Sequence, residues 1–477
     1  MLKIVLLSAS FFLAVLQGKS QELWGAANSN YAGAMGHDLN PASIVATPFK
    51  WELHVISASG SVMNNYVYLK KNSRAFRNGL NGEGLGENRF SDRYTTNDKE
   101  AYGSAFVKLP SFMYSTKKWG LGFHVATRAA ASARGVPYHL AKFMYEGFFY
   151  DPQQQIDYTG GNMSVAGMNW HEAGVTGGIM VFNRPDAALT AGISINYLYG
   201  LNSYYLQVDK INYNMQADTL WQIDIADVEY GHAYSEIPRD FWKKKGGGVS
   251  SSVGVQYYRN RNDIAYDPCL DNKQKKYDYK IGLSIIDIGY IKFNRITSKY
   301  FLTDVSSDWY GIDTVKINGV TNADSIFNNQ FFGSPAGGLA ASGYTLWMPA
   351  AASIQFDYSL TPSIYLNFSA IQRLPISDYA IKRANQLSIT ARYETKQFEI
   401  AIPYSFYDYF RHRIGVAIRY GIFTVGTDMI GPYTGLSNAY GMDFYFGIKW
   451  QGFQSCGSKV RNHKSFKGSR TDCFDKF

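Results

Sequence analysis

Apolar and polar residues alternate at every second position along most of this 477-residue chain. Residues 187–200 (AALTAGISINYLYG) carry Leu, Ile and Tyr on one face and Thr, Gly, Ser and Asn on the other, and residues 386–393, 413–420 and 440–450 repeat the pattern. Successive side chains of a β-strand point to opposite faces, so this period predicts strands that are apolar on one face only. The chain is therefore predicted to be all-β.

Fourteen segments carry the strand pattern, and the connections between them fall into two length classes. The segments are residues 51–70, 102–116, 119–132, 168–183, 187–206, 247–259, 277–294, 346–358, 363–373, 385–394, 397–405, 411–420, 422–430 and 439–450. The connections after the first, third, fifth and seventh strands are long, at residues 71–101, 133–167, 207–246 and 295–345. Those after the second, fourth, eighth, tenth and twelfth strands are tight turns.

An even strand number with short turns on one side and long loops on the other is typical of an outer-membrane barrel. We therefore expect a transmembrane antiparallel β-barrel of about fourteen strands at residues 51–450, with long extracellular loops. The pair Ile285 and Ile286 breaks the alternation of its strand, which predicts a β-bulge there.

The composition and the first twenty residues indicate an exported membrane protein. Aromatic residues make up 16% of the chain, with 37 Tyr and 30 Phe, and such side chains concentrate where a surface meets both lipid and water. Lys3 precedes an apolar run at residues 4–16, and residues 18–20 form a small-x-small cleavage site. Residues 1–20 are therefore predicted to be a signal peptide, and the mature chain is expected in the outer membrane of a Gram-negative cell.

Residues 21–50 separate the signal from the first strand and contain Asn40, Pro41 and Ala42. Pro41 fixes its own φ and restricts Asn40 to extended conformations, so the stretch reads as a rigid turn. A Gly- and Ala-rich segment, then Asn-Pro-Ala, then an aromatic-rich strand resembles the start of FadL-type barrels, which include long-chain fatty-acid transporters and the secretion barrel PorV. The resemblance implies that residues 21–50 fold back into the barrel as a plug.

The C-terminal stretch RYGIFTVGTD at residues 419–428, followed by a last strand that bears Asp443, resembles an uncharacterised Bacteroidota branch of such barrels. After Trp450 the chain continues as a basic tail at residues 451–477, with six Lys and Arg against two Asp. The tail is predicted to be periplasmic, where it either contacts peptidoglycan, anionic lipid or a protein partner or is a solvated end. Cys456 and Cys473 are expected to form a disulfide that leaves Cys269 unpaired.

No catalytic or cofactor-binding constellation is present in the sequence. There is no GxSxG elbow, Walker loop or dinucleotide fingerprint, and the pair His171 and Glu172 lacks the second His of a zinc protease motif. The eight His residues are scattered, and the formal charge of +9 is spread over loops. We therefore expect no enzyme, no cofactor, no metal site and no nucleic-acid partner.

Ionisable residues on the polar faces of the strands are candidates for the barrel lumen. They are His124, Arg128, Arg373, Arg392, Glu399, Arg413, Arg419 and Asp443. Two interpretations are open: the residues line a selective aqueous path, or they form pairs that fill and rigidify the barrel.

An apolar capture site is predicted in the second long loop and the strand before it. Leu140, Phe143, Met144, Phe148 and Phe149 approximate helical spacing, which is consistent with an outward apolar groove. Ala130 and Ala131 leave little side-chain bulk in the third strand, where FadL-type barrels carry a lateral opening. The alternative is that the aromatic residues cap the barrel and the alanines let a loop pack closely.

Two functions remain open at this point. The first is FadL-like uptake or passage of small hydrophobic molecules, in contact with outer-membrane lipids, which requires an apolar pocket that leads to a gap in the wall. The second is a non-transporting platform for secretion or envelope protein partners, as PorV is, which requires only a sealed barrel with exposed loops. The candidate gating residues for transport are Asn40, Pro41 and Ala42.

Overall fold

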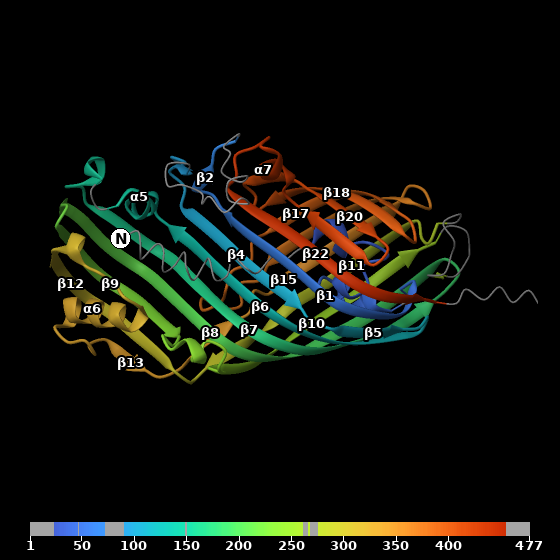
Figure 1. Cartoon of the computed structure of the whole chain (residues 1–477), viewed down its shortest axis with the longest axis horizontal. Helices are drawn as coiled ribbons and strands as arrows, with labels where there is room; N and C mark the ends of the chain where they lie inside the picture. Colours follow the sequence, from blue (N-terminus) through green and yellow to red (C-terminus); the bar gives the residue numbers. More distant parts are fainter. Residues whose placement is uncertain are drawn as a thin grey trace, which may run out of the picture.

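The computed structural model of the chain describes residues 23–45, 47–71, 90–147, 150–260, 266–267 and 275–454 (Figure 1). The predicted signal peptide, Phe148, Phe149, the three Cys residues and most of the predicted tail lie outside these residues.

The wall is a closed antiparallel barrel of fourteen strands. Around the ring it runs through β1 (Phe49–Asn64), β4 (Lys99–Lys108) with β5 (Ser111–Ser115), β6 (Trp119–Val136), β7 (Tyr158–Asn183), β8 (Ala187–Ala217), β10 (Gly246–Arg259), β11 (Tyr279–Phe293), β14 (Tyr344–Trp347) with β15 (Ala351–Ser359), β16 (Ile364–Arg373), β17 (Gln386–Glu394), β18 (Phe398–Tyr407), β19 (Arg411–Ile414) with β20 (Val416–Tyr420), β21 (Phe423–Thr427) and β22 (Gly441–Phe453). β1 pairs with both β4 and β22, which closes the ring. The fourteen predicted strands correspond to these in order, so the predicted fold is confirmed.

The barrel carries its apolar side chains on the outside. Leu366 and Phe368 of β16 are 42% and 40% exposed, whereas Asn367 between them is fully buried in the lumen. Thr390 of β17 and Asp357 of β15 are likewise buried inside. In a soluble protein the apolar side chains of a sheet point inward. The opposite arrangement seen here is typical of a barrel whose outer face meets lipid.

Among the described residues, none of the helices has both the length and the apolar character that a membrane crossing requires.

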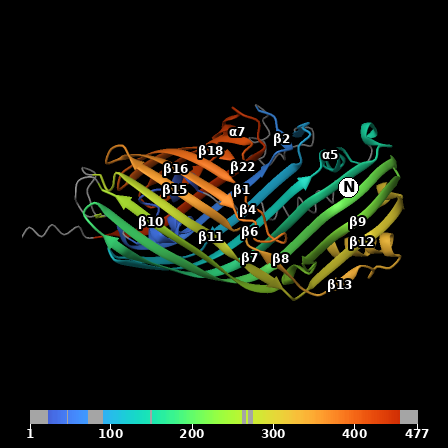
Figure 2. The same cartoon turned by 180° about the vertical axis from the view of Figure 1, so that it is seen from behind.

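Three of the predicted long loops contain regular structure that extends the sheet beyond one end of the barrel (Figures 1 and 2). β7 and β8 continue past the ring, β8 pairs there with β9 (Leu220–Ala233), and β9 pairs with β12 (Thr297–Tyr310). Helix α6 (Val320–Phe332) packs against β12. The expectation of loops at residues 133–167, 207–246 and 295–345 was therefore wrong. Along β8 the physical reason is a set of register shifts near Val208, Lys210 and Met215, which interrupt the period-two pattern.

The remaining short elements lie in the connections between the strands of the barrel and of the sheet extension. They are β2 (Val67–Leu69), β3 (Phe90–Asp92), α5 (Tyr138–Glu146), η3 (Asp151–Gln153), η4 (Pro238–Asp240), η5 (Ile312–Thr314), β13 (Leu339–Ala341) and α7 (Ile430–Thr434).

A short N-terminal segment lies inside the barrel, at the end opposite the sheet extension (Figure 1). It forms α2 (Trp24–Ala27), α3 (Ala34–His37) and the 3-10 helix η1 (Pro41–Ile44). Trp24 is 1% exposed, and its indole Nε1 donates to Gln386 Oε1 of the wall at 3.0 Å. We call residues 23–48 the plug.

The predicted irregularity in β11 is confirmed. The register between β10 and β11 shifts after Ser251, so that Ile288 faces Ser251 whereas Ile285 faces Val253. Asp287 within this bulge has a φ of 56°, in the left-handed region that a bulge residue can adopt. The bulge turns the Asp287 carboxylate toward the lumen, where it accepts hydrogen bonds from two arginines.

Candidate functional site

The turn at Asn40 and Pro41 is seated against a patch of wall glycines. A Cβ on Gly192 of β8 would lie 2.5 Å from the carbonyl carbon of Pro41, and one on Gly120 of β6 would lie 2.5 Å from the Ile44 carbonyl oxygen. Gly178, Gly254 and Gly282 meet the same turn on β7, β10 and β11. Because glycine has no side chain, the plug approaches these five strands closely, with its backbone at Gly120 and Gly192 and with the side chains of Asn40, Ile44 and Val45 at the other three. We call these five residues the glycine slot.

Asn40 fixes the turn in the glycine slot. Its backbone is extended, with φ −153° and ψ 109°, as Pro41 requires. Its Oδ1 accepts a hydrogen bond from Ala42 N at 3.0 Å and thereby caps η1. Its Nδ2 donates to Val255 O at 3.1 Å and to Gln355 Oε1 at 3.0 Å, both in the wall. One side chain therefore both shapes the turn and binds it to β10 and β15.

An open apolar groove of about 580 Å³ lies on the outer surface of the same part of the wall. It is lined by outward Val253, Leu283, Ile285 and Ile354, each at least 38% exposed, and it includes Gly192 and Gly254 of the glycine slot. At these two glycines the wall is only a backbone thick, with the plug turn on one side and the groove on the other. β8, β10 and β11 are nevertheless hydrogen-bonded throughout this region.

Charged side chains of β1, β4 and β22 hold the plug from the part of the wall next to the glycine slot. Lys108 Nζ donates to both carboxylate oxygens of Asp38, at 2.9 and 2.8 Å. Lys449 donates to two plug carbonyls and lies 3.3 Å from Glu52, whose Oε1 accepts from Ala34 N at 2.9 Å. The side chains of Lys108, Lys449 and Glu52 are buried, whereas that of Asp38 is 40% exposed. Each buried charge has both an ion pair and hydrogen bonds, which is the arrangement in which buried charges are tolerated.

Burial of the plug also sets the protonation of His37. Removal of its imidazole from water, followed in size by the nearby Lys108 cation, lowers the pKa of His37 from 6.5 to about 3. Glu52 and Asp38 oppose this shift without cancelling it. His37 is therefore neutral at neutral pH while the plug is in place.

Above the plug, an ion-pair cluster spans the lumen. Arg128 of β6 makes a two-pronged contact with Asp287, with both N to O distances at 2.9 Å, and lies 3.4 Å from Glu172. Arg383 donates to Asp287 Oδ2 at 2.6 Å. These residues and His37 border a cavity of about 70 Å³, which has room for a few water molecules rather than for a ligand.

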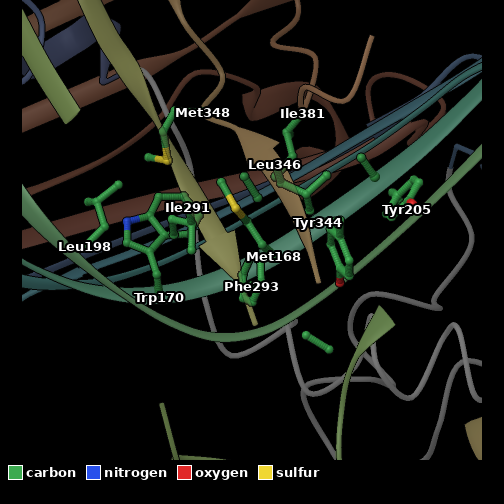
Figure 3. Packing of buried hydrophobic residues seen from close by; sticks show 13 residues of the cluster. Met168, Trp170, Leu198, Tyr205, Ile291, Phe293, Tyr344, Leu346, Met348 and Ile381 are labelled. Atoms are coloured by element: carbon green, nitrogen blue, oxygen red, sulfur yellow. The ribbon is translucent and has the colours of Figure 1, made fainter. Parts of the chain in front are cut away.

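Arg383 belongs to an inward-folded segment at residues 374–385, between β16 and β17, which we call the lumen loop. Trp347 N donates to Tyr379 O at 2.9 Å, and Lys382 N donates to Ser132 Oγ at 2.9 Å, so the lumen loop is bound to two sides of the barrel. Ile381 is 2% exposed and joins an apolar cluster inside the barrel (Figure 3). The cluster also contains Met168, Trp170, Leu198, Ile291, Phe293, Tyr344, Leu346 and Met348.

The polar lumen candidates are all found in paired arrangements. Arg419 lies 2.9 Å from Glu399, and Arg392 lies 2.9 Å from Asp357 and 3.0 Å from Glu394. The remaining candidates contact interior partners as well: His124 with Glu172, Arg128 with Asp287, Arg373 with Asp408, Arg413 with Gln386, and Asp443 with the Asp428 amide. Of the two interpretations, the geometry favours pairs that fill the barrel.

The predicted capture residues do not share one surface. α5 forms where helical spacing indicated, but Phe143 is 2% exposed and packs on Tyr213 and Met215, whereas Met144 is 57% exposed. Leu140 is half-buried beside the same cluster.

The wall is continuous at the alanines of the third strand. Ala130 pairs with Ser104 of β4 and with Met168 of β7, and Ala131 pairs with residues of the same two strands. In this conformation β6 therefore has hydrogen-bonded neighbours on both sides at the place where the resemblance implied an opening.

Within the described part of the chain, no group of three or more His, Cys, Asp or Glu residues is placed to hold a metal ion. His171 and Glu172 point to opposite faces of β7: His171 stacks on Trp242, whereas Glu172 is 4% exposed and accepts from Trp170 Nε1 at 3.0 Å.

Sequence reasoning missed the glycine slot, Asp287 and Arg383. The bulge signal at Ile285 and Ile286 lay next to Asp287 and was the one local indication of it. The glycines lie on five strands that are far apart in sequence, so that no motif joins them.

A protein-family model described as a family of unknown function, DUF5723, matches residues 41–428. No curated protein matches the chain. Among solved structures, a TodX hydrocarbon channel mutant is similar with 6% identity over 88% of this chain and 95% of that one, at a TM-score of 0.44. The Pseudomonas putida toluene transporter TodX is similar with 9% identity over 89% and 93% of the chains, at a TM-score of 0.30. The Ralstonia pickettii transporter TbuX shows 10% identity over 89% and 95%, at a TM-score of 0.29.

Proposed function

The chain belongs to the DUF5723 family, and we propose that it is an outer-membrane barrel through which small hydrophobic molecules pass, with the plug as its gate. The observation that carries this proposal is the position of the Asn40 turn. The turn occupies the inner side of the wall at Gly192 and Gly254, and the outer side of the same strands carries the apolar groove. The described conformation is the closed state, because the turn fills the glycine slot and the wall strands are hydrogen-bonded.

The turn is held weakly enough to move. Its polar links to the wall are those of the Asn40 side chain to Val255 O, Gln355 Oε1 and, at 3.5 Å, Leu283 O, together with the bond that Ser284 Oγ donates to Leu39 O at 2.7 Å. Each such hydrogen bond contributes about 1 kcal/mol net. An apolar ligand that enters the vacated slot gains roughly 25 cal/mol per Å² of buried apolar surface. Burial of a small hydrocarbon therefore offsets much of the cost of displacing the turn.

The chemistry of the route selects hydrophobic molecules. The outer groove is lined by Ala, Gly, Val, Leu, Ile and Ser residues only. In the glycine slot, Gly178 faces Ile44 and Val45 of the plug, whereas Gly254 and Gly282 face the uncharged amide of Asn40. A charged solute finds no side chain of opposite charge among these residues, so most of the cost of its leaving water is not offset.

The rival function is a membrane platform for secretion or envelope partners. The observation that favours it is the sheet of β7, β8, β9 and β12, which continues beyond the barrel and offers a protein-binding surface. The platform function needs no movement of the plug, whereas passage requires it.

A reversible cross-link between the plug and the wall separates the two functions. Asn40 Cγ lies 3.0 Å from the position of a Cβ on Gly254, so cysteines at both positions are within disulfide reach. The variant N40C with G254C is made in a background in which Cys269, Cys456 and Cys473 are replaced by Ser. Uptake of a radiolabelled fatty acid and of a radiolabelled monoaromatic hydrocarbon is measured in cells, oxidised and then reduced.

For a gated channel, uptake above that of barrel-free cells is lost on oxidation and recovers with a membrane-permeant reductant. Each single-cysteine variant serves as control and keeps its uptake under both conditions. Equal uptake in cells with and without the wild-type barrel contradicts passage and leaves the platform function.

A further inference from the structure

A basic and aromatic band crosses the outer surface of the barrel near the sheet extension, and we propose that it binds the phosphate groups of lipid headgroups in the adjoining membrane leaflet. We call it the basic rim; its charged members are Arg239, Lys243, Lys244, Lys292 and Arg295.

Strand register places the rim at the membrane boundary. On the outer face of β8, Ile193 and Ile195 are followed by Tyr197 and Tyr199. Tyr197 is 51% exposed and is the eleventh residue of β8, which begins at Ala187, and roughly 9 to 11 residues carry a tilted strand across the hydrocarbon core. The aliphatic surface therefore gives way to aromatic residues where the core ends, as in the aromatic girdles of membrane barrels.

The aromatic row continues across neighbouring strands at the same level. Tyr197 pairs with Val249 of β10, Val249 with Tyr290 of β11, and Tyr290 with Trp347 of β14. Tyr290 is 40% exposed, and its ring contacts that of Trp347 at 5.4 Å. This row marks the interface between hydrocarbon and headgroups on this side of the barrel.

Lysines occupy the next row outward. Tyr199 pairs with Gly247, and Gly247 pairs with Lys292, which is exposed. A Cβ on Gly247 would lie 3.3 Å from Lys244 Nζ, so the side chain of Lys244 lies over the space that this glycine leaves. Lys244 Nζ donates to the Tyr197 hydroxyl at 2.5 Å and lies 5.5 Å from the centre of the Tyr199 ring. Its ammonium is thus held directly above the aromatic row.

The connection between β9 and β10 completes the band. Trp242 is 61% exposed and stacks on the outward His171, with ring centres 5.8 Å apart and planes at 6°. Lys245 O accepts hydrogen bonds from the backbone of Asn294 and Arg295, at 3.1 and 3.2 Å. These bonds bring the segment that carries Arg239, Lys243 and Lys244 beside the end of β11.

The rim has more cations than carboxylates. Asp240 forms ion pairs with both Lys243, at 2.7 Å, and Arg239, at 3.8 Å. In the part of the chain that the structure describes, no carboxylate lies within ion-pair distance of Lys244, Lys292 or Arg295. Several cations directly above an aromatic row fit an anionic headgroup, whose acyl chains lie along the aliphatic surface below and whose phosphate meets the lysines.

Lipid binding to the purified full-length protein tests the proposal. The variant K244Q with K292Q is compared with wild type by native mass spectrometry, with bis-phosphorylated lipid A and its dephosphorylated form as probes. The matched control is K118Q with K396Q, because Lys118 and Lys396 are exposed lysines in tight turns at the opposite end. Heat-modifiable migration on gels verifies that each variant is folded.

We expect the affinity of the rim variant for phosphorylated lipid A to fall about tenfold or more, since each basic residue near an anionic surface contributes severalfold. The control variant is expected to keep the wild-type affinity for phosphorylated lipid A. Dephosphorylated lipid A is expected to bind weakly, and with the same affinity, to the wild type and to the rim variant. Equal loss in both variants, or equal binding of the two lipids to wild type, overturns the proposal. The proposal is also overturned if millimolar inorganic phosphate displaces bound lipid A as effectively as free lipid A does, because that result indicates a simple anion site.

Discussion

Asn40 Nδ2 of the plug lies 3.0 Å from Gln355 Oε1 of β15, although 315 residues separate the two in sequence. The same nitrogen donates to Val255 O of β10. The plug turn is therefore bound across two strands that flank β11, at the place where glycines let it reach the wall. The first two predictions concern this contact.

Replacement of Asn40 by Ala is expected to loosen the turn. The change removes the η1 cap and leaves Gln355 Oε1 without this donor, so we expect a loss of about 2 kcal/mol in plug docking. Hydrogen exchange at residues 39–45 should become faster while exchange in the wall strands is unchanged. Asn212→Ala, in the exposed sheet extension, is the control and should leave exchange in the plug as in wild type.

A side chain in the glycine slot is expected to expel the turn. In Gly192→Ala the new Cβ meets the Pro41 backbone at 2.5 Å, and the β8 backbone cannot move away without breaking its pairing with β7 and β10. Gly177→Ala on the adjacent β7 is the matched control, because its Cβ meets nothing within 4 Å. We expect a cysteine placed at Ala42 to react with a maleimide at least tenfold faster beside the Gly192 change than beside the Gly177 change. Equal rates would contradict the slot.

The link between Arg383 and Asp287 is expected to keep the lumen loop folded inward. In Arg383→Met the loop loses a 2.6 Å ion pair, and Asp287 retains only Arg128, so the closed loop should lose about 3 kcal/mol. Single-channel recordings in planar bilayers should then show openings that wild type lacks. Lys382→Met, whose ammonium donates to Ser377 O within the same loop, should behave as wild type.

Plug docking is expected to weaken in acid. The pKa of His37 is lowered to about 3 by burial and by Lys108 while the plug is docked, whereas it returns to about 6.5 when the plug leaves. The displaced plug therefore binds the extra proton, so stability is complete above pH 6.5 and falls as the pH drops toward 3. Between pH 6.5 and 5 the loss is about 2 kcal/mol.

Maleimide labelling of a cysteine at Ala42, followed across this pH range, measures the effect after correction for thiol reactivity. The neighbours that face His37, namely Lys108, Glu52, Asp38 and His124, remain in place in the variant His37→Gln. That variant should show a much flatter profile. An unchanged slope would assign the acid response to another group.

The outer face of β16 is expected to require apolar residues. Leu366 is 42% exposed on this face, and an arginine there must enter the hydrocarbon layer, which costs about 2 to 4 kcal/mol at mid-bilayer depth. Urea unfolding of Leu366→Arg in lipid vesicles should show this loss. Thr303→Arg on the exposed part of β12, outside the barrel ring, should change stability by less than about 0.5 kcal/mol.

The sequence by itself determined the barrel. Alternation in segments such as residues 386–393 follows from the two-residue repeat of an extended backbone, which is a local property. The number of such segments predicted the strand number, and the order of short and long connections then indicated a membrane barrel. The same local logic located the bulge beside Asp287 and the extended backbone of Asn40. It failed along β8 beyond Val208, because bulges there shift the faces and hide the sheet extension.

Only the tertiary structure decided what these elements contact. Strand register and the closure of β1 against β22 bring Asn40 to Gln355 and place Gly192 where it makes room for Pro41. The path of the lumen loop brings Arg383 to Asp287. Each of these contacts joins residues that are distant in the chain. Burial and pairing inside a closed barrel are properties of the whole ring, so no single strand carries the information from which they follow.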